Sequence, residues 1–308
     1  YTGEVAEDIV ADLRALGGLH TVEDFANQRC SYVDPISITY RGTELYEIPP
    51  NLQGIVALVM LKIIDRLGGK LGDGPVSAER YHIMMEAVRL AFAMRDKFVA
   101  DPEHADVPVE HMLSDAFADE LARRIDRKAR KADLGPIPQP KGTDTIYMSV
   151  VHKDGSIVSL IQSNYSGFGS GMVPPGTGFM LQNRGGLFSL EKNQPNTLAP
   201  RKRPLHTIIP AFMEKGDTKI GFGIMGGWNQ GQAHAQFVSN IVDHGFTIQQ
   251  ALEAGRFTKG TFEGCDVDIE VLVPEATRSA LTARGHKLDV ILPRTGTFGY
   301  GQAVMNGA

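Results

Sequence analysis

The side chains best suited to chemistry gather around one hairpin sequence, DTIYMSVVHKDGSIVSLIQSNY. Two runs rich in β-branched residues, 146–151 and 157–161, are joined by an Asp-Gly pair that favours a tight turn. Antiparallel pairing about that turn places Thr145 opposite Ser163, or one step diagonal to it. The sequence therefore predicts two hydroxyl groups that meet at the mouth of a hairpin.

The segment before Thr145 suggests how its hydroxyl could be activated. A threonine hydroxyl is a weak nucleophile until a base takes its proton, and an α-amine freed by cutting the preceding peptide bond can be that base. Residues 131–144, KADLGPIPQPKGTD, contain too many Pro and Gly residues for a regular helix or a central strand. We expect an exposed linker that ends at Thr145. A threonine that merely favours a strand is the alternative interpretation.

Two other motifs are further candidates for a functional site. Gly226 and Gly227, in GIMGGWNQ, lie between a predicted strand and a predicted helix, so their N–H groups could face a developing oxyanion. A tight turn that requires small residues is the alternative. His206 and Thr207, in APRKRPLHT, follow Pro204. The alternative is that this motif is a solvated basic loop that leads into a strand.

Bulk properties exclude several classes of protein. The 308 residues carry a formal net charge of −5, which argues against a general nucleic-acid binder. Cys30 and Cys265 are too few for a disulfide scaffold or a zinc knuckle. Two free buried thiols are the expectation and one bridge is the alternative. The apolar run 55–60 soon meets charged residues, which predicts a core helix and no membrane span.

The two ends suggest a piece of a longer polypeptide, because the chain starts at a Tyr inside a helical pattern and stops without an obvious cap. Any signal peptide would lie upstream, so the compartment stays open between the cytoplasm, the periplasm and secretion.

Hydrophobic periodicity predicts a helical first part and a strand-rich second part. Helices are expected over 5–16, near 21, and over 54–67, 78–99, 114–128, 248–256 and 275–284, with another from about 226. Besides the hairpin, extended segments are expected over 36–49, 179–183, 206–213, 218–225, 268–273 and 288–292. Antiparallel strands followed by helices predict a layered α+β fold and not βαβ winding.

Together and in this order, DTIYMSVVHKDGSIVSL, FGSGMVPPGTGFMLQN, KRPLHTIIPAF and MGGWNQ resemble motifs of the γ-glutamyltransferase family, the glutathione hydrolases and related acylases. The resemblance covers essentially the whole chain. It implies the α+β fold of N-terminal-nucleophile hydrolases, a four-layer αββα sandwich of stacked antiparallel sheets. Only part of that sandwich would be present in this chain. It also implies that residues 1–144 are the C-terminal part of a large subunit, mainly helical. Residues 145–308 would be a small subunit, truncated at its C-terminus, that stays paired with the large one after self-cleavage.

The resemblance also implies catalytic roles. Thr145 would be the nucleophile, exposed by cleavage of the Asp144–Thr145 bond. Ser163 stands where the family commonly has a second threonine that hydrogen-bonds the nucleophile, and a serine keeps that hydroxyl. Gly226 and Gly227 match the glycines of the oxyanion hole.

Substrate-binding positions depart from the best-known glutathione hydrolases. His206 and Thr207 match two serines that bind the substrate carboxylate, and Tyr165 replaces a usual asparagine. Leu187 stands where an aspartate grips the glutamyl α-amine, so a charge-assisted hydrogen bond worth roughly 1.5 to 3 kcal/mol is lost. Arg184 replaces a glutamine and could recognise a carboxylate or acyl oxygen bidentately, a surface arginine being the alternative.

This pattern resembles the glutathione-hydrolase-like branch that includes oxamate amidohydrolase and cephalosporin-acylase-type enzymes. It predicts a self-processing amide hydrolase that forms an acyl-threonine with a small amide bearing a carboxylate. No metal or organic cofactor is expected, and the partner is a small molecule and not a nucleic acid or a membrane. One alternative is a γ-glutamyl hydrolase or transpeptidase that acts on glutathione. The other is a non-catalytic, unprocessed homologue.

Overall fold

An antiparallel sheet of five strands forms the centre of the computed structural model, which describes residues 2–69, 71–130, 144–260, 266–293 and 295–307. Its order is β1 (Ile36–Tyr40), β2 (Thr43–Glu47), β5 (Ala211–Lys215), β6 (Thr218–Ile224) and β10 (Gly301–Asn306). β2 pairs with β5, so segments from both sides of the predicted linker share one sheet. Residues 131–143 of that linker lie outside the described ranges.

Helices cover one face of this sheet: α3 (Gly54–Arg66), α4 (Ala78–Phe98) and α7 (Asn229–His244). Every residue of α3 from Gly54 to Leu61 is buried, which confirms the core helix expected for the apolar run. The ring of Phe222, on β6, lies 4.8 Å from that of Phe237, on α7, and joins sheet to helix. No helix in the described part of the chain is long and apolar enough to cross a membrane.

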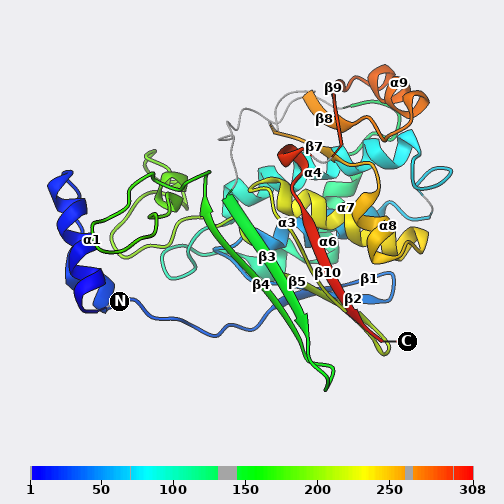
Figure 1. The fold of residues 1–308 in the computed structure, drawn as a ribbon. Coiled ribbons are helices and arrows are strands. Elements are labelled where there is room, and N and C mark those ends of the chain that lie inside the picture. The colour runs from blue at the N-terminus through cyan, green and yellow to red at the C-terminus, as the bar shows by residue number, and fades with distance from the viewer. Residues whose placement is uncertain (1, 70, 131–143, 261–265, 294, 308) are drawn as a thin grey trace.

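A hairpin of β3 (Asp144–Val151) and β4 (Ile157–Tyr165) covers the opposite face, as Figure 1 shows. The hairpin packs against two glycines of β6, Gly221 and Gly223, which have no side chains. A Cβ on Gly223 would collide with the ring of Tyr147, and one on Gly221 would lie 2.6 Å from Ile157 Cγ2. Helices, sheet and hairpin therefore form three stacked layers, and two glycines permit the close approach of the last two.

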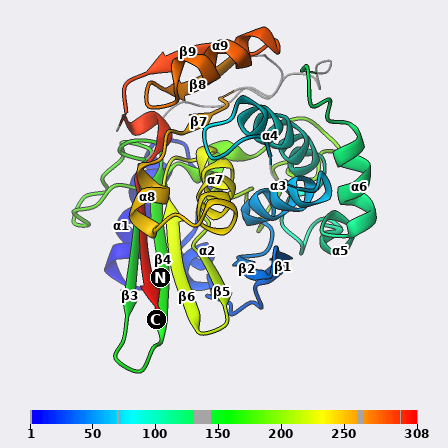
Figure 2. The same cartoon turned by 90° about the vertical axis from the view of Figure 1, so that its right-hand side faces the viewer.

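The remaining elements surround these layers (Figure 2). They are α1 (Glu4–Ala15), α2 (Val22–Ala26), α5 (Val109–Met112), α6 (Asp115–Arg123), η1 (Arg184–Leu187), α8 (Ile248–Glu253), β7 (Phe257–Thr258), β8 (Asp266–Glu270), α9 (Glu275–Ala283), β9 (Lys287–Ile291) and η2 (Gly296–Phe298). A capping box between Thr21 and Asp24 starts α2, the helix expected near residue 21. β8 and β9 pair in parallel and are joined by α9, a local βαβ unit beside the antiparallel central sheet of the expected α+β fold.

Several expected elements differ from the structure. Residues 179–183 form no strand, because Leu181 pairs with Ser170 and Met172 inside a loop. The segment expected over 206–213 becomes a strand only at Ala211. The extended segment 36–49 is a two-stranded hairpin that turns at Arg41 and Gly42.

Other differences concern element ends and the cysteines. α6 ends at Arg123 instead of residue 128, and α8 ends at Glu253 instead of residue 256. β10 was not expected at all, since its pairing with β6 is long-range. Cys30 is free but exposed, so the expectation of a buried thiol is wrong there, and Cys265 lies outside the described residues.

The glycine contact between hairpin and sheet can be tested with Gly223→Ala. The added methyl collides with the Tyr147 ring, so the free energy of unfolding is expected to fall by about 1 to 3 kcal/mol. Gly296→Ala is the control, since a Cβ there would meet nothing within 4 Å. Urea denaturation of the natural full-length protein measures both, and equal midpoints for the two variants would contradict the packing described.

Candidate active site

The predicted pair of hydroxyls is present at the mouth of the hairpin. Thr145 lies opposite Ser163, as expected, with a bulge between Asp144 and Thr145. The Thr145 Oγ1 atom is 2.8 Å from Ser163 Oγ, and the backbone N–H of Tyr165 donates to the same Ser163 oxygen at 2.8 Å. Either hydroxyl of this pair can be the donor in the hydrogen bond between them. Thr145 is 3% exposed.

Arg184 lies beside this pair, buried under Tyr165. Tyr165 ends β4 with a φ of 79°, and the Arg184 guanidinium carbon is 4.6 Å from the centre of its ring. Arg184 is 3% exposed, so the surface interpretation is wrong. Its Nη1 donates to Thr207 Oγ1. Within the described residues Nε and Nη2 have no hydrogen-bond partner. These two atoms form one edge of the guanidinium, the edge that binds a carboxylate in two parallel hydrogen bonds.

Arg184 is the positive group of this candidate site. Burial lowers the pKa of Arg184 to about 10, so it stays protonated near neutrality. Burial, together with the charge of Arg184, lowers the pKa of His206 to about 3, so that imidazole is neutral. Burial also raises the pKa of Tyr165, although Arg184 opposes the shift. The result is one buried cation against the Tyr165 ring and within electrostatic reach of a neutral imidazole, an environment that favours an anionic ligand.

His206 and Thr207 lie on an extended segment that is pinned to the loop before α3. The N–H of His206 donates to the Asn51 carbonyl at 2.9 Å, and the N–H of Gln53 donates to the His206 carbonyl at 3.0 Å. The Gln53 side chain also donates to the Thr207 carbonyl at 2.8 Å. This pairing replaces the strand expected from residue 206 and holds the Thr207 hydroxyl against Arg184.

Gly226 and Gly227 form the turn between β6 and α7, with φ values of 128° and 57° that only glycine adopts easily. The Gly226 carbonyl accepts from the Asn229 N–H at 2.9 Å, and the Gly227 carbonyl from the Gln230 N–H at 3.3 Å. In a trans peptide the N–H points opposite to the carbonyl. The N–H groups of Gly227 and Trp228 therefore point out of the positive end of α7, where an anion is stabilised.

The packing of the hairpin on the sheet brings these parts to one end. Ile157 lies over Gly221, and Tyr147, further toward the mouth of the hairpin, lies over Gly223. One more step along the same face leads from Tyr147 to Thr145 on β3. The corresponding step on β6 leads past its end to the Gly226–Gly227 turn. The hydroxyl pair and the glycine turn thus occupy the same end of the hairpin–sheet interface.

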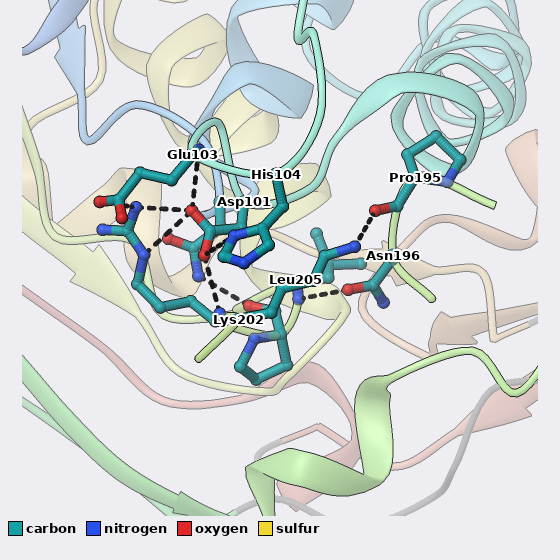
Figure 3. A network of polar contacts seen from close by, with 10 residues as sticks. Asp101, Glu103, His104, Pro195, Asn196, Lys202 and Leu205 are labelled. Carbon is teal, nitrogen blue, oxygen red and sulfur yellow. Dashed lines mark hydrogen bonds and ion pairs between the residues drawn. The ribbon is translucent and has the colours of Figure 1, made fainter. Parts of the chain in front are cut away.

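A buried carboxylate anchors the loop that leads into His206 (Figure 3). Asp101 accepts hydrogen bonds from the Arg203 backbone N–H at 2.8 Å and from Arg203 Nη2 at 2.6 Å. The Leu205 N–H donates to Asn196 Oδ1 at 2.9 Å and closes the loop on itself. Burial alone would raise the pKa of Asp101, but the hydrogen bonds from Arg203 and Glu103 outweigh it and lower the pKa to about 2. Asp101 is therefore ionised whenever the loop is in place.

Three contributing residues were missed from the sequence: Gln53, Arg95 and Trp228. Arg95, 1% exposed, donates from Nη1 to Gln53 Oε1 at 3.3 Å and lies 4.0 Å from the centre of the Trp228 ring. Arg95 is a charged residue within a buried helix, and Gln53 a polar residue in front of one. The one signal in the sequence was a polar residue in an otherwise apolar segment, because such a residue, once buried, needs a hydrogen-bond partner.

The Asp101 anchor predicts a defined dependence of stability on pH. Asp101→Asn is expected to lower the free energy of unfolding by about 2 kcal/mol at neutral pH. The neutral amide oxygen of Asn accepts weaker hydrogen bonds from Arg203 than the ionised carboxylate does. The pKa of Asp101 is lowered on folding, so the stabilisation is full above about 4 and is lost as the pH falls toward 2. Denaturation of both proteins between pH 7 and pH 3 measures this, and a difference that grows on acidification would contradict it.

Comparison with known proteins places these features in a family. The Gamma-glutamyltranspeptidase family matches residues 1–308. The chain is 37% identical over 296 residues to the glutathione hydrolase-like YwrD proenzyme of Bacillus subtilis (strain 168), covering 94% of this chain and 55% of that protein. It is 34% identical over 310 residues to the oxamate amidohydrolase proenzyme of Klebsiella pneumoniae subsp. pneumoniae, covering 99% of this chain and 57% of that protein.

The fold is similar to the crystal structure of cephalosporin acylase from Bacillus halodurans, with a TM-score of 0.89 and 44% identity. That match covers 100% of this chain and 55% of the acylase chain. The chain thus spans about half the length of the relatives it matches. With a match that extends over every residue of the sequence, this chain belongs to the Gamma-glutamyltranspeptidase family.

Proposed function

We propose that the natural protein is a self-processing amide hydrolase with Thr145 as its nucleophile. One observation carries the proposal: a buried threonine hydroxyl, 2.8 Å from Ser163 Oγ, directly follows the Asp144–Thr145 bond at a bulge. The relatives from B. subtilis and K. pneumoniae are both named proenzymes, which supports maturation by cleavage.

Maturation consumes one water molecule. Thr145 Oγ1 attacks the carbonyl carbon of Asp144, the C–N bond breaks, the hydroxyl proton passes to the Thr145 nitrogen, and the acyl group thereby moves from nitrogen to oxygen. Water then hydrolyses the resulting ester and leaves Asp144 with a free carboxylate and Thr145 with a free α-amine.

In turnover the α-amine of Thr145 takes the hydroxyl proton as Oγ1 attacks the amide carbonyl of the substrate. Ser163 donates a hydrogen bond to Oγ1 and orients it. The oxyanion that forms is stabilised by N–H groups of the Gly226–Gly227 turn at the start of α7. The leaving amine takes the proton, and water activated by the same α-amine then hydrolyses the acyl-threonine.

The buried edge of Arg184 supports a substrate that carries a carboxylate. Two N–H groups of this cation lack partners among the described residues, and a carboxylate satisfies both at once. Thr207 holds the opposite side of the guanidinium, so its role is to orient Arg184. Leu187, on η1, offers no charge to a substrate ammonium, which favours a simple carboxy-acyl amide over a γ-glutamyl amide.

We also infer two subunits, residues 1–144 and 145–308, that stay together after cleavage. The pairing of β2 with β5 and the burial of α3 against α7 support this, since both contacts join the two parts. The outer face of the hairpin exposes Ile146, Met148 and Val150. A fourth layer of helices over that face would complete the αββα sandwich.

The nucleophile is tested by intact-mass spectrometry of the natural full-length protein. The wild type is expected as two chains, the second beginning at Thr145. Thr145→Ala, which has no hydroxyl, is expected as one uncut chain without amidase activity, while Thr145→Ser keeps the hydroxyl and is expected to be cut. A Thr145→Ala protein that still matures and turns over amide would refute the mechanism, and an uncut, inactive wild type would identify a non-catalytic homologue.

The role of Arg184 is tested with Arg184→Lys, which keeps the charge but loses the paired N–H edge. For glutaryl anilide or oxamate, kcat/KM is expected to fall by about 10- to 100-fold, mainly through KM. For an uncharged acyl anilide it should hardly change, which makes that substrate the internal control. A wild type that prefers γ-glutamyl anilide would instead favour a glutathione hydrolase.

A further inference from the structure

Gln53 joins the two halves of the candidate site. Its side chain is fully buried, and Nε2 donates one hydrogen bond to the Thr207 carbonyl and one to the Gly227 carbonyl, each at 2.8 Å. Its Oε1 accepts from Arg95 Nη1 at 3.3 Å. One amide thus links the residue that holds Arg184 to the turn assigned to the oxyanion.

The side chain of Gln53 is not needed to start its own helix. Gln53 occupies the N-cap position of α3, but its side chain makes no capping hydrogen bond. Both of its N–H groups are directed instead to carbonyls about 150 residues and more away in sequence. Because both acceptors are carbonyl oxygens, the amide orientation is unambiguous. Its role therefore concerns the distant loops.

The consequence for the turn follows from peptide geometry. The bond from Gln53 fixes the plane of the Gly227–Trp228 peptide, whose N–H points away from α7. Arg95 also supports this peptide, since it donates a hydrogen bond to Gln53 and stacks on the Trp228 ring. The other Gln53 bond fixes the Thr207 backbone, and Thr207 Oγ1 holds Arg184.

We propose that Gln53 is a positioning residue that sets the distance between the carboxylate anchor at Arg184 and the oxyanion turn at Gly227. This inference rests on the proposed function. A substrate whose carboxylate lies on Arg184 and whose amide oxygen lies at the turn must span that distance. Gln53 then determines which acyl chain length is accepted.

The experiment compares two variants of the natural full-length protein, Gln53→Met and Gln232→Met. Gln232 is a matched control, because it is fully buried and also bonds two backbone groups, the N–H and carbonyl of Lys259. Gln53→Glu is a second variant of nearly the same shape, in which an ionised side chain cannot donate to the two carbonyls. Kinetics are measured with succinyl and glutaryl anilides, which differ by one methylene, and the melting temperature is recorded for each protein.

The wild type is expected to prefer one chain length by about tenfold or more. Both Gln53 variants should lower kcat by about 10- to 100-fold and bring the ratio of the two kcat/KM values toward one. Gln232→Met should lower the melting temperature but keep the ratio.

Two results would overturn the inference alone: an active wild type without a length preference, or Gln53 variants that keep the wild-type ratio. A wild type inert toward every amide would instead refute the proposed function, and this inference with it.

Discussion

The contact of the hairpin with the bare backbone of β6 is the constraint on which the rest of the structure depends. Gly221 and Gly223 remove the side chains that would otherwise keep the two layers apart, and the Tyr147 ring occupies the space at Gly223. Because Thr145 follows on the same face of β3, this contact sets its height above the end of β6. A larger residue in β6 would raise the hairpin and separate Thr145 from the glycine turn.

Around that rigid contact, the candidate site is assembled from segments with little regular structure. Residues 203–209 take their shape from buried polar anchors, namely the side chains of Asp101, Asn51 and Gln53. Each anchor is a side chain from the first part of the chain that bonds backbone groups of the second part. Buried polar groups of this kind must all be satisfied, so the loops have few alternative conformations. A precise arrangement of loops is thereby obtained without strands.

The charge distribution follows from the same requirement that buried polar and charged groups have partners. Asp101 is paired with Arg203 and stays ionised, while His206 is half-buried near a cation and stays neutral. Arg184 has its hydroxyl partner Thr207 and a free edge within the described residues. Burying such an edge is unfavourable for the protein alone. This supports the proposal of a ligand with one negative charge that completes the edge.

The sequence by itself determined the local features of this protein. The hairpin register, and with it the meeting of Thr145 and Ser163, follows from strand alternation and one Asp-Gly turn, and the long helices follow from their apolar periodicity. Family motifs indicated the Gly226–Gly227 turn. Only the tertiary structure decided that Arg184 is buried with a free edge, that residues 206–209 are held by a loop instead of a strand, and that Gln53 and Arg95 belong to the site. Local patterns depend on neighbours within a few positions, whereas these buried polar side chains depend on partners in other elements, which for Gln53 are more than a hundred residues away.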